Sequence, residues 1–160
     1  MTKLTVSSSL FEEGGMIPSS AVHSYAGGGN RSPDLSWKDA PPGTASFALT
    51  CYDPDAPTEV GFVHWILFNI PREITSLPEG AGTAGGNPSG SILGYTDWGN
   101  NEYGGCAPPP GDPPHHYLFT VYALDVPKLE LGSSTTYAFL RFSLRGHILA
   151  EGTRTGLFGA

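Results

Sequence analysis

The residues best suited to chemistry are six polar side chains within or beside apolar segments: Asp53, Asp55, His64, His115, His116 and Tyr117. Burying an imidazole or a carboxylate is costly unless the group is paired, so we expect these side chains to pair with one another or to meet a ligand. An imidazole raised in pKa by a nearby carboxylate can donate a charge-assisted hydrogen bond to an anion. The residue types therefore predict a binding site or an acid–base site.

Two of these histidines stand where a proline-rich turn enters a long apolar strand. The strand is expected from residue 117 onward, because β-branched and aromatic residues dominate there and no glycine or proline interrupts them until Pro127. Side chains alternate along a strand, so His115 shares a face with Tyr117, whereas His116 lies on the other face. Only one of the two histidines can face a given pocket.

Two further apolar segments predict strands that could hold the remaining polar residues. The strand over 45–52 delivers Asp53 at its C-terminal end, and the strand over 62–70 carries His64 near its start. If these strands and the strand that follows His115 are neighbours in a sheet, their ends bring Asp53, His64 and His115 to one rim. The sequence therefore predicts a shared site, on the condition of that topology.

The rest of the chain predicts fewer regular elements. Weak alternation favours an edge strand over 3–11 and a short strand over 16–24, and residues 72–114 have the glycine and proline content of a long functional loop. Apolar residues at helical spacing predict a helix that starts at Ser133 or Ser134 and ends near residues 150–152. Its two arginines, at 141 and 145, are expected to be solvated.

Composition limits the class of protein. The 160 residues include 22 glycines and 15 prolines, which favours a single β-rich domain over 1–160. A net charge of −7 with only 8 Lys and Arg residues argues against nucleic acid or an anionic membrane surface as partner. No segment has the length and apolar character of a signal peptide or a membrane span, so we expect a cytoplasmic protein.

The two cysteines carry little chemistry of their own. Cys51 and Cys106 cannot form a disulfide framework, and their separation fits no zinc ligand pair without further thiols. Cys106 could line the same cavity as the histidines, but no base adjacent in sequence marks it as a nucleophile. We therefore expect no metal and no cofactor to depend on either thiol.

Five motifs, taken in order, resemble the phosphatidylethanolamine-binding protein family, and in particular its compact bacterial and archaeal branch, often labelled Raf-kinase-inhibitor-like. The motifs are residues 30–37, Asp53-Pro54-Asp55-Ala56-Pro57, residues 64–71, residues 103–111, and His115-His116-Tyr117. The resemblance covers nearly the whole chain. The most specific part is the combination of Asp-Pro-Asp-Ala-Pro with the downstream His-x-Tyr.

The resemblance implies a mostly β fold, a β-sandwich of two antiparallel sheets with one C-terminal helix and short helical turns. It also implies a small rim pocket for phosphate, phosphoryl head groups or similar anions, without a cofactor or a metal. The residues that match the family's ligand-binding positions are Asp53, His64, Pro109, His115 and Tyr117. Asp55 would hold the loop and Cys106 would support the site, while His116 would pack on the opposite face of its strand.

The resemblance further implies a homodimer, and by analogy a protein kinase or a protease as partner. Because the charge of Asp53 repels a phosphate dianion, we expect monoanionic ligands to be preferred. A binding module is the leading interpretation. One alternative is a hydrolase in which Asp53 orients His64 or His115 as general base on a small ester or phosphoester, and another is a divalent metal held by two histidines and one carboxylate.

Overall fold

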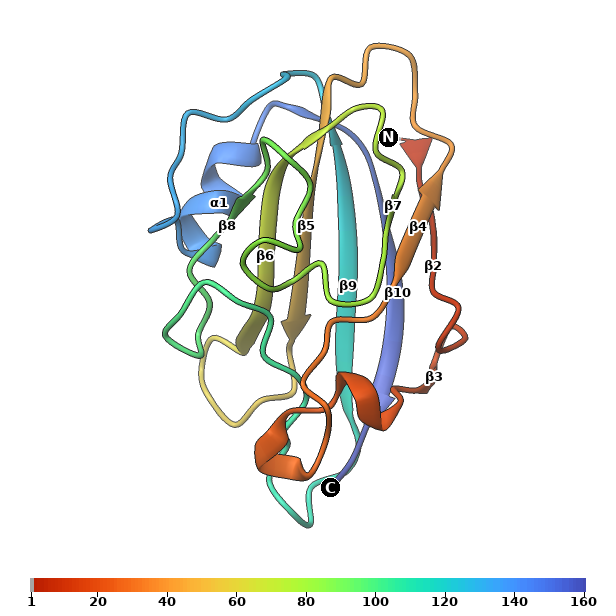
Figure 1. Cartoon of the computed structure of the whole chain (residues 1–160), viewed down its shortest axis with the longest axis vertical. Coiled ribbons are helices and arrows are strands. Elements are labelled where there is room, and N and C mark those ends of the chain that lie inside the picture. The colour runs from red at the N-terminus through yellow and green to blue at the C-terminus, as the bar shows by residue number, and fades with distance from the viewer. Residues whose placement is uncertain (1) are drawn as a thin grey trace.

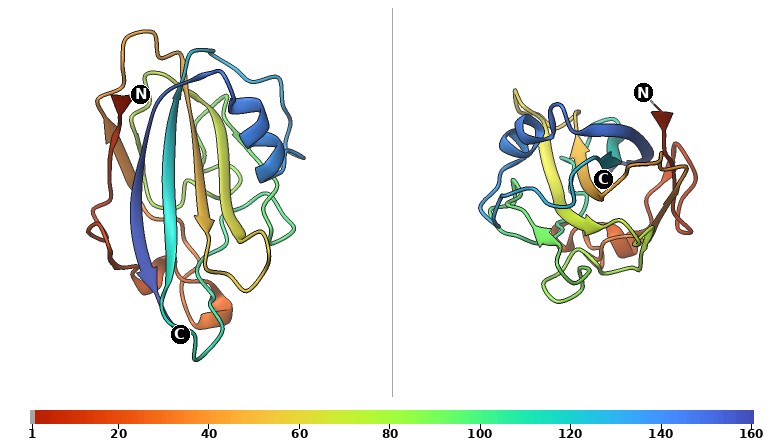
Figure 2. Two further views of the ribbon diagram at one scale, coloured as in Figure 1. Left: turned by 180° about the vertical axis from the view of Figure 1, so that it is seen from behind. Right: turned by 90° about the horizontal axis from the view of Figure 1, so that it is seen from above.

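The chain folds into two β-sheets that pack face to face, with one helix on the outer face of the larger sheet (Figures 1 and 2). The computed structural model describes residues 2–160. The larger sheet has seven strands in the order β1-β10-β9-β5-β6-β8, with β3 also pairing with β10, and the smaller has the order β2-β4-β7. The mostly β fold with two sheets confirms the expected class.

The elements have the following bounds. The larger sheet contains β1 (Thr2–Lys3), β3 (Gly15–Met16), β5 (Ser46–Asp53), β6 (Phe62–Pro71), β8 (Ile92–Leu93), β9 (His115–Leu124) and β10 (Ile148–Phe158). The smaller sheet contains β2 (Thr5–Ser7), β4 (Leu35–Lys38) and β7 (Ser76–Leu77). The helix is α1 (Tyr137–Leu144), and two short 3₁₀ turns are η1 (Ser19–Ala21) and η2 (Ser24–Ala26).

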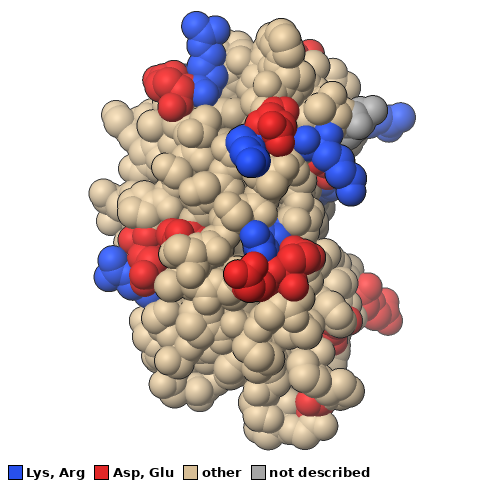
Figure 3. Space-filling view, turned by 90° about the vertical axis from the view of Figure 1, so that its right-hand side faces the viewer, with Lys and Arg blue, Asp and Glu red and all other residues tan. Residues whose placement is uncertain are grey.

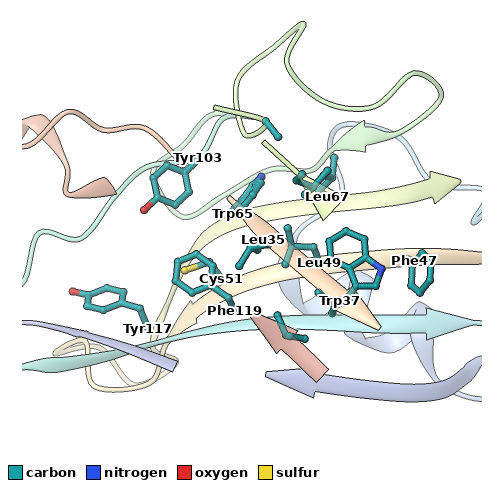
Figure 4. Packing of buried hydrophobic residues seen from close by; sticks show 14 of the residues in the cluster. Leu35, Trp37, Phe47, Leu49, Cys51, Trp65, Leu67, Tyr103, Tyr117 and Phe119 are labelled. Atoms are coloured by element: carbon teal, nitrogen blue, oxygen red, sulfur yellow. The ribbon is translucent and has the colours of Figure 1, made fainter. Parts of the chain in front are cut away.

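Strands β5, β6 and β9 form the centre of the larger sheet and are buried on both faces. Between the two sheets lies one hydrophobic cluster, which includes Leu35 and Trp37 of β4 against Phe47 and Leu49 of β5 (Figure 4). A second cluster fills the space between the other face and α1. Burial on both faces explains why these strands read as continuous apolar runs rather than as alternating ones.

The order β9-β5-β6 meets the condition for a shared site. Strand β5 is antiparallel to both neighbours, so its C-terminal end lies beside the beginnings of β6 and β9. This end of the sheet is the lower end in Figure 1, where the loops after β5 and before β9 gather with η1, η2 and the C-terminus. The predicted meeting of the three strand ends at one rim is confirmed.

The C-terminal helix is shorter than the helical spacing predicted. Helix α1 begins after Thr136, whose hydroxyl accepts a hydrogen bond from Phe139 N at 3.3 Å, and Gly146, with φ of +84°, directs the chain away from the helix. Residues 148–158 then form β10, which pairs with β9 along almost its whole length. The expectation that the helix reaches residues 150–152 was therefore wrong, because tertiary pairing recruits these residues into the sheet.

The two arginines at 141 and 145 are exposed, as expected. Arg141 makes an additional contact with the sheet: its Nη1 donates a hydrogen bond to the Tyr122 hydroxyl at 2.6 Å, and its guanidinium lies 5.4 Å from the centre of that ring. The helix is thereby tied to β9 by a polar contact as well as by its apolar face.

The N-terminal third is more broken than expected. The strand predicted over 3–11 is divided into β1 and β2, which belong to different sheets, and the chain crosses between them at buried Leu4. Of the strand predicted over 16–24, only Met16 lies in a strand, the two-residue β3, and η1 and η2 follow it. Val22 contributes an isolated bridge to Cys106, so this segment supports the loop before β9 instead of adding a strand.

Candidate functional site

A β-bulge directs His64 towards the site. Cys51 pairs with Trp65, but Tyr52 pairs with Val63, so His64 is the extra residue on β6. An extra residue shifts the alternation, and a bulge of this kind re-aims a side chain. His64 consequently faces Tyr117 of β9, with ring centres 5.3 Å apart, whereas Val63 packs on the helix side of the sheet.

His115 is held by two carboxylates, one on each ring nitrogen. Its Nδ1 lies 2.8 Å from Asp53 Oδ2, and its Nε2 lies 2.9 Å from Asp112 Oδ2. Burial of His115 alone would lower its pKa, but the hydrogen bonds to Asp53 and Asp112 and their charges outweigh this effect and raise the pKa. The expected partnership of Asp53 with a histidine is thus made with His115, and Asp112 is a partner that the sequence interpretation missed.

His64 has the opposite electrostatic character. Burial lowers its pKa, and its Nδ1 lies 2.7 Å from the carbonyl oxygen of Gly104. The Trp98 indole N–H also approaches this nitrogen, at 3.3 Å, and can only donate, so the two neighbours of Nδ1 require opposite tautomers. The contact with the carbonyl oxygen is shorter by 0.6 Å and a carbonyl oxygen can only accept, so we assign the proton to Nδ1 and the lone pair of neutral His64 to Nε2. The two histidines are therefore different groups at neutral pH: His115 is the one whose surroundings favour the charged form.

The hydroxyl of Tyr117 is buried and makes no hydrogen bond to a described residue. Its polar neighbour is the Cys106 thiol, which is a weak hydrogen-bonding group. Burial raises the pKa of both the phenol and the thiol, so both are neutral at physiological pH. Cys106 thus supports the ring of Tyr117 as a neutral neighbour and has no thiolate character.

Asp53, His64, His115 and Tyr117 line a pocket of about 270 Å³ at the rim of the sheet, whereas Cys106 and Asp112 lie outside its lining. The full lining consists of Asp53, Ala56, Pro57, Thr58, Phe62, His64, Trp98, Ala107, Pro108, Pro109, His115 and Tyr117. All five predicted ligand-binding positions are in this set, and Pro109 belongs to its proline wall. Figure 4 shows Tyr117 with Tyr103 at one end of the hydrophobic cluster, with their hydroxyl groups directed away from Phe47 and Trp37.

The loop segments that face the strands across the pocket are held in place by close packing at Gly104 and Gly105. Gly104 N donates to His64 O at 3.0 Å, and a Cβ on Gly104 would lie 2.2 Å from Cδ1 of Trp98. The next residue, Gly105, donates its N–H to the side chain of Asn30 at 2.7 Å. Trp98 and Asn30 were not assigned a role from the sequence, because their position in long loops carries no periodic signal.

His116 does not pack against the opposite face as expected. Its side chain is 54% exposed, and its Nδ1 lies 2.7 Å from Asp55 Oδ2, which also accepts from His116 N. Burial alone would raise the pKa of Asp55, but the hydrogen bonds from His116 lower it overall. Asp55 thus ties the loop after β5 to the start of β9 from outside the pocket.

The described residues offer no cluster suited to a metal ion. Within residues 2–160, no group of three or more His, Cys, Asp and Glu side chains is arranged to hold a metal ion. Figure 3 shows one face on which Lys and Arg lie interspersed with Asp and Glu. Among the described helices, none has the length and apolar character needed to cross a membrane.

The fold and the pocket together define a class: a β-sandwich protein with a rim pocket built from an aspartate, two histidines and a tyrosine. A sequence model described as phosphatidylethanolamine-binding protein matches residues 7–159. The chain belongs to the phosphatidylethanolamine-binding protein family, as the motifs indicated.

Individual relatives support this assignment and are bacterial and archaeal. The UPF0098 protein YbcL of Escherichia coli K12 is 41% identical over 157 residues, which are 96% of this chain and 86% of that protein. A UPF0098 protein of Methanothermobacter thermautotrophicus is 41% identical over 148 residues, covering 92% of this chain and 93% of the relative. The crystal structure of E. coli YbcL, described as a new member of the mammalian PEBP family, superposes with a TM-score of 0.94 at 40% identity and covers 99% of both chains.

Proposed function

We propose that the protein is a binding module whose rim pocket takes a small anion, such as phosphate or the phosphoryl group of a larger ligand. The observation that carries the proposal is the buried hydroxyl of Tyr117, which makes no hydrogen bond to a described residue, has only the Cys106 thiol as a weakly bonding neighbour, and lies in a pocket with His64 and His115. A buried donor without a partner is costly, and a ligand oxygen would satisfy it. Membership of the family agrees with a binding role.

The charge balance of the pocket favours a monoanion. The lining contains no lysine or arginine, so His115 is the group that can supply positive charge, and Asp53 lies against it. Neutral His64 offers a lone pair at Nε2, which can accept a proton-bearing oxygen such as P–OH. A singly protonated phosphoryl group would therefore bond to both histidines, whereas a dianion would meet Asp53 without a proton to share.

Isothermal titration with inorganic phosphate and with phosphoethanolamine tests the proposal. We choose His64→Asn, because the asparagine amide can keep the hydrogen bond to the Gly104 carbonyl while Nε2 is lost. We expect both ligands to bind wild type and to bind this variant at least about fivefold more weakly, the value of one lost hydrogen bond. His147→Asn is the matched control, since His147 is exposed and pairs with Asp125 outside the pocket. Absence of binding to wild type, or equal binding to wild type and His64→Asn, contradicts the proposal.

One observation favours a second candidate, a hydrolase acting on a small ester or phosphoester. Asp53 and His115 form a carboxylate–imidazole pair at 2.8 Å, the arrangement that orients a general base. Against it, the other nitrogen of His115 is bonded to Asp112, and the neutral Cys106 and Tyr117 are poor nucleophiles. Turnover of generic ester substrates that disappears in both His64→Ala and Asp53→Asn would establish the enzyme.

The family resemblance also leads us to propose a homodimer, a cytoplasmic location, and a protein kinase or protease as partner. Each rests on the similarity of the motifs to that family. Sedimentation equilibrium of the purified chain tests the dimer, and cell fractionation tests the location. Inhibition assays against a panel of kinases and proteases test the partner, with His64→Asn showing whether the pocket is involved.

A further inference from the structure

We propose that Asp112 is the specificity-determining residue of the pocket: its carboxylate binds His115 Nε2 in place of a ligand, and an incoming anion must displace it. The inference rests on the proposed anion-binding function. It concerns a residue outside the pocket lining and outside the motif positions matched to ligand binding.

Both hydrogen-bonding positions of His115 are occupied before any ligand arrives. Nδ1 faces Asp53 at 2.8 Å and Nε2 faces Asp112 at 2.9 Å. An imidazolium has two N–H donors and no more. A phosphate oxygen can therefore bond to His115 only if one of the two carboxylates leaves its position.

The two carboxylates differ in how firmly they are held. The side chain of Asp53 is 4% exposed, and its Oδ1 also accepts from Asp55 N at 2.8 Å. The side chain of Asp112 is 37% exposed, and its contact with His115 is the hydrogen bond that its carboxylate makes among the described residues. Moving Asp53 would bury an unpaired charge, whereas Asp112 can turn towards water at little cost. Asp112 is thus the displaceable partner.

The backbone around Asp112 leaves room for this movement. Residues 109–111 and 113–114 are exposed, and Asp112 N is hydrogen-bonded to Pro109 O at 3.2 Å in a turn. The side chain of His115, by contrast, is 4% exposed and fixed at the start of β9. Displacement therefore requires the carboxylate of one turn residue to rotate, while the base of the pocket stays in place.

The charge of the pocket also affects the competition between Asp112 and an anion for His115 Nε2. With His115 protonated, the group of Asp53, His115 and Asp112 carries a net charge of −1, and the pocket lining supplies no lysine or arginine to offset it. An anion must approach this negative group and then replace a carboxylate in a charge-assisted hydrogen bond. Ligands without an anionic acceptor gain too little to displace Asp112, so the pocket selects for anions despite its acidic surroundings.

Phosphate titration of three variants tests the competition. Asp112→Asn removes the charge and keeps a weaker acceptor, and Asp112→Ala removes both. Asp125→Asn is the matched control, because Asp125 also pairs with a histidine at 2.8 Å but follows the other end of β9. Titrations in a buffer free of other oxyanions, at pH 7, measure the dissociation constant of inorganic phosphate for each protein.

We expect Asp112→Ala to bind phosphate about 10-fold more tightly than wild type, Asp112→Asn to lie between them, and Asp125→Asn to match wild type. A residue that only supported the fold would give the reverse, weaker binding on removal. Equal or weaker binding by both Asp112 variants overturns the competition while leaving the anion site intact. If wild type and all variants fail to bind phosphate, the anion site itself is overturned, and the competition with it.

Discussion

Two aspartate–histidine pairs stand on opposite sides of the start of β9, and they differ in burial far more than in geometry. Asp53 and His115 are 2.8 Å apart with side chains 4% exposed, whereas Asp55 and His116 are 2.7 Å apart with side chains 40% and 54% exposed. The histidines are adjacent in sequence, and the aspartates are two residues apart in one turn. Strand alternation alone places one pair inside the sandwich and the other in solvent.

The same two residue types, aspartate and histidine, have a structural role in the exposed pair and are available for binding in the buried pair. An exposed pair gains little, because water screens the charges and both side chains lose freedom. A buried pair is costly to break, because the remaining charge stays in a poorly solvated position. The exposed pair, Asp55 and His116, can therefore hold the loop after β5 in place, while the buried pair, Asp53 and His115, can bind a ligand.

The largest effect is expected from Asp53→Asn. This change leaves protonated His115 buried with Asp112 as its remaining carboxylate, so we expect the free energy of unfolding to fall by about 3 kcal/mol. Chemical denaturation at pH 6 measures the loss. A loss below about 1 kcal/mol, with the native fold retained by circular dichroism, would show that Asp112 alone can satisfy His115.

The pH dependence of stability should separate the two pocket histidines by sign. The pKa of His115 is raised in the folded protein, so its contribution is complete below about pH 6.5, the unfolded value, and is lost as the pH rises through the folded pKa. The pKa of His64 is lowered, so it destabilises the fold as the pH falls below about 6.5. Unfolding free energies of wild type, His115→Asn and His64→Asn, measured from acid to alkaline pH, test both signs. Parallel curves for wild type and His115→Asn would refute the stabilising ion pair.

Tyr117→Phe should weaken binding without lowering stability. The hydroxyl makes no hydrogen bond to a described residue and its burial in that state is costly, so removing it should raise the free energy of unfolding by up to about 1 kcal/mol. Phosphate affinity should fall about fivefold, because one hydrogen bond to the ligand is lost. Thermal denaturation and titration on the same samples make the comparison. An unchanged affinity would mean that this hydroxyl does not contact the anion.

The smallest effect is expected from Asp55→Asn, the outer counterpart of Asp53→Asn. The pair with His116 is exposed, and the asparagine oxygen can still accept from His116 N, so the loss of stability should be below about 0.5 kcal/mol. Phosphate affinity should match that of wild type. A loss comparable to that of Asp53→Asn would show that burial does not explain the difference between the two pairs.

Much of the fold could be predicted because each central strand coincides with a continuous run of apolar residues in the sequence. The three apolar runs match β5, β6 and β9 to within two residues, since burial on both faces demands continuous apolar residues. The wrong prediction that the C-terminal helix extends to residues 150–152 also came from a local pattern of apolar residues. Tyr137, Leu140, Leu144 and Ile148 have helical spacing, but only the first three lie in α1, because Ile148 begins a strand whose pairing with β9 the local sequence does not encode.

The sequence by itself determined which side chains could form the site, because polar residues at the ends of apolar strands and the family motifs both identify them. Only the tertiary structure decided how they pair. The bulge that turns His64 inward, the choice of His115 as partner of Asp53, and the arrival of Asp112 at the other nitrogen depend on register and loop packing. Such contacts join residues far apart in the chain, and local propensity says nothing about which of several carboxylates will meet an imidazole.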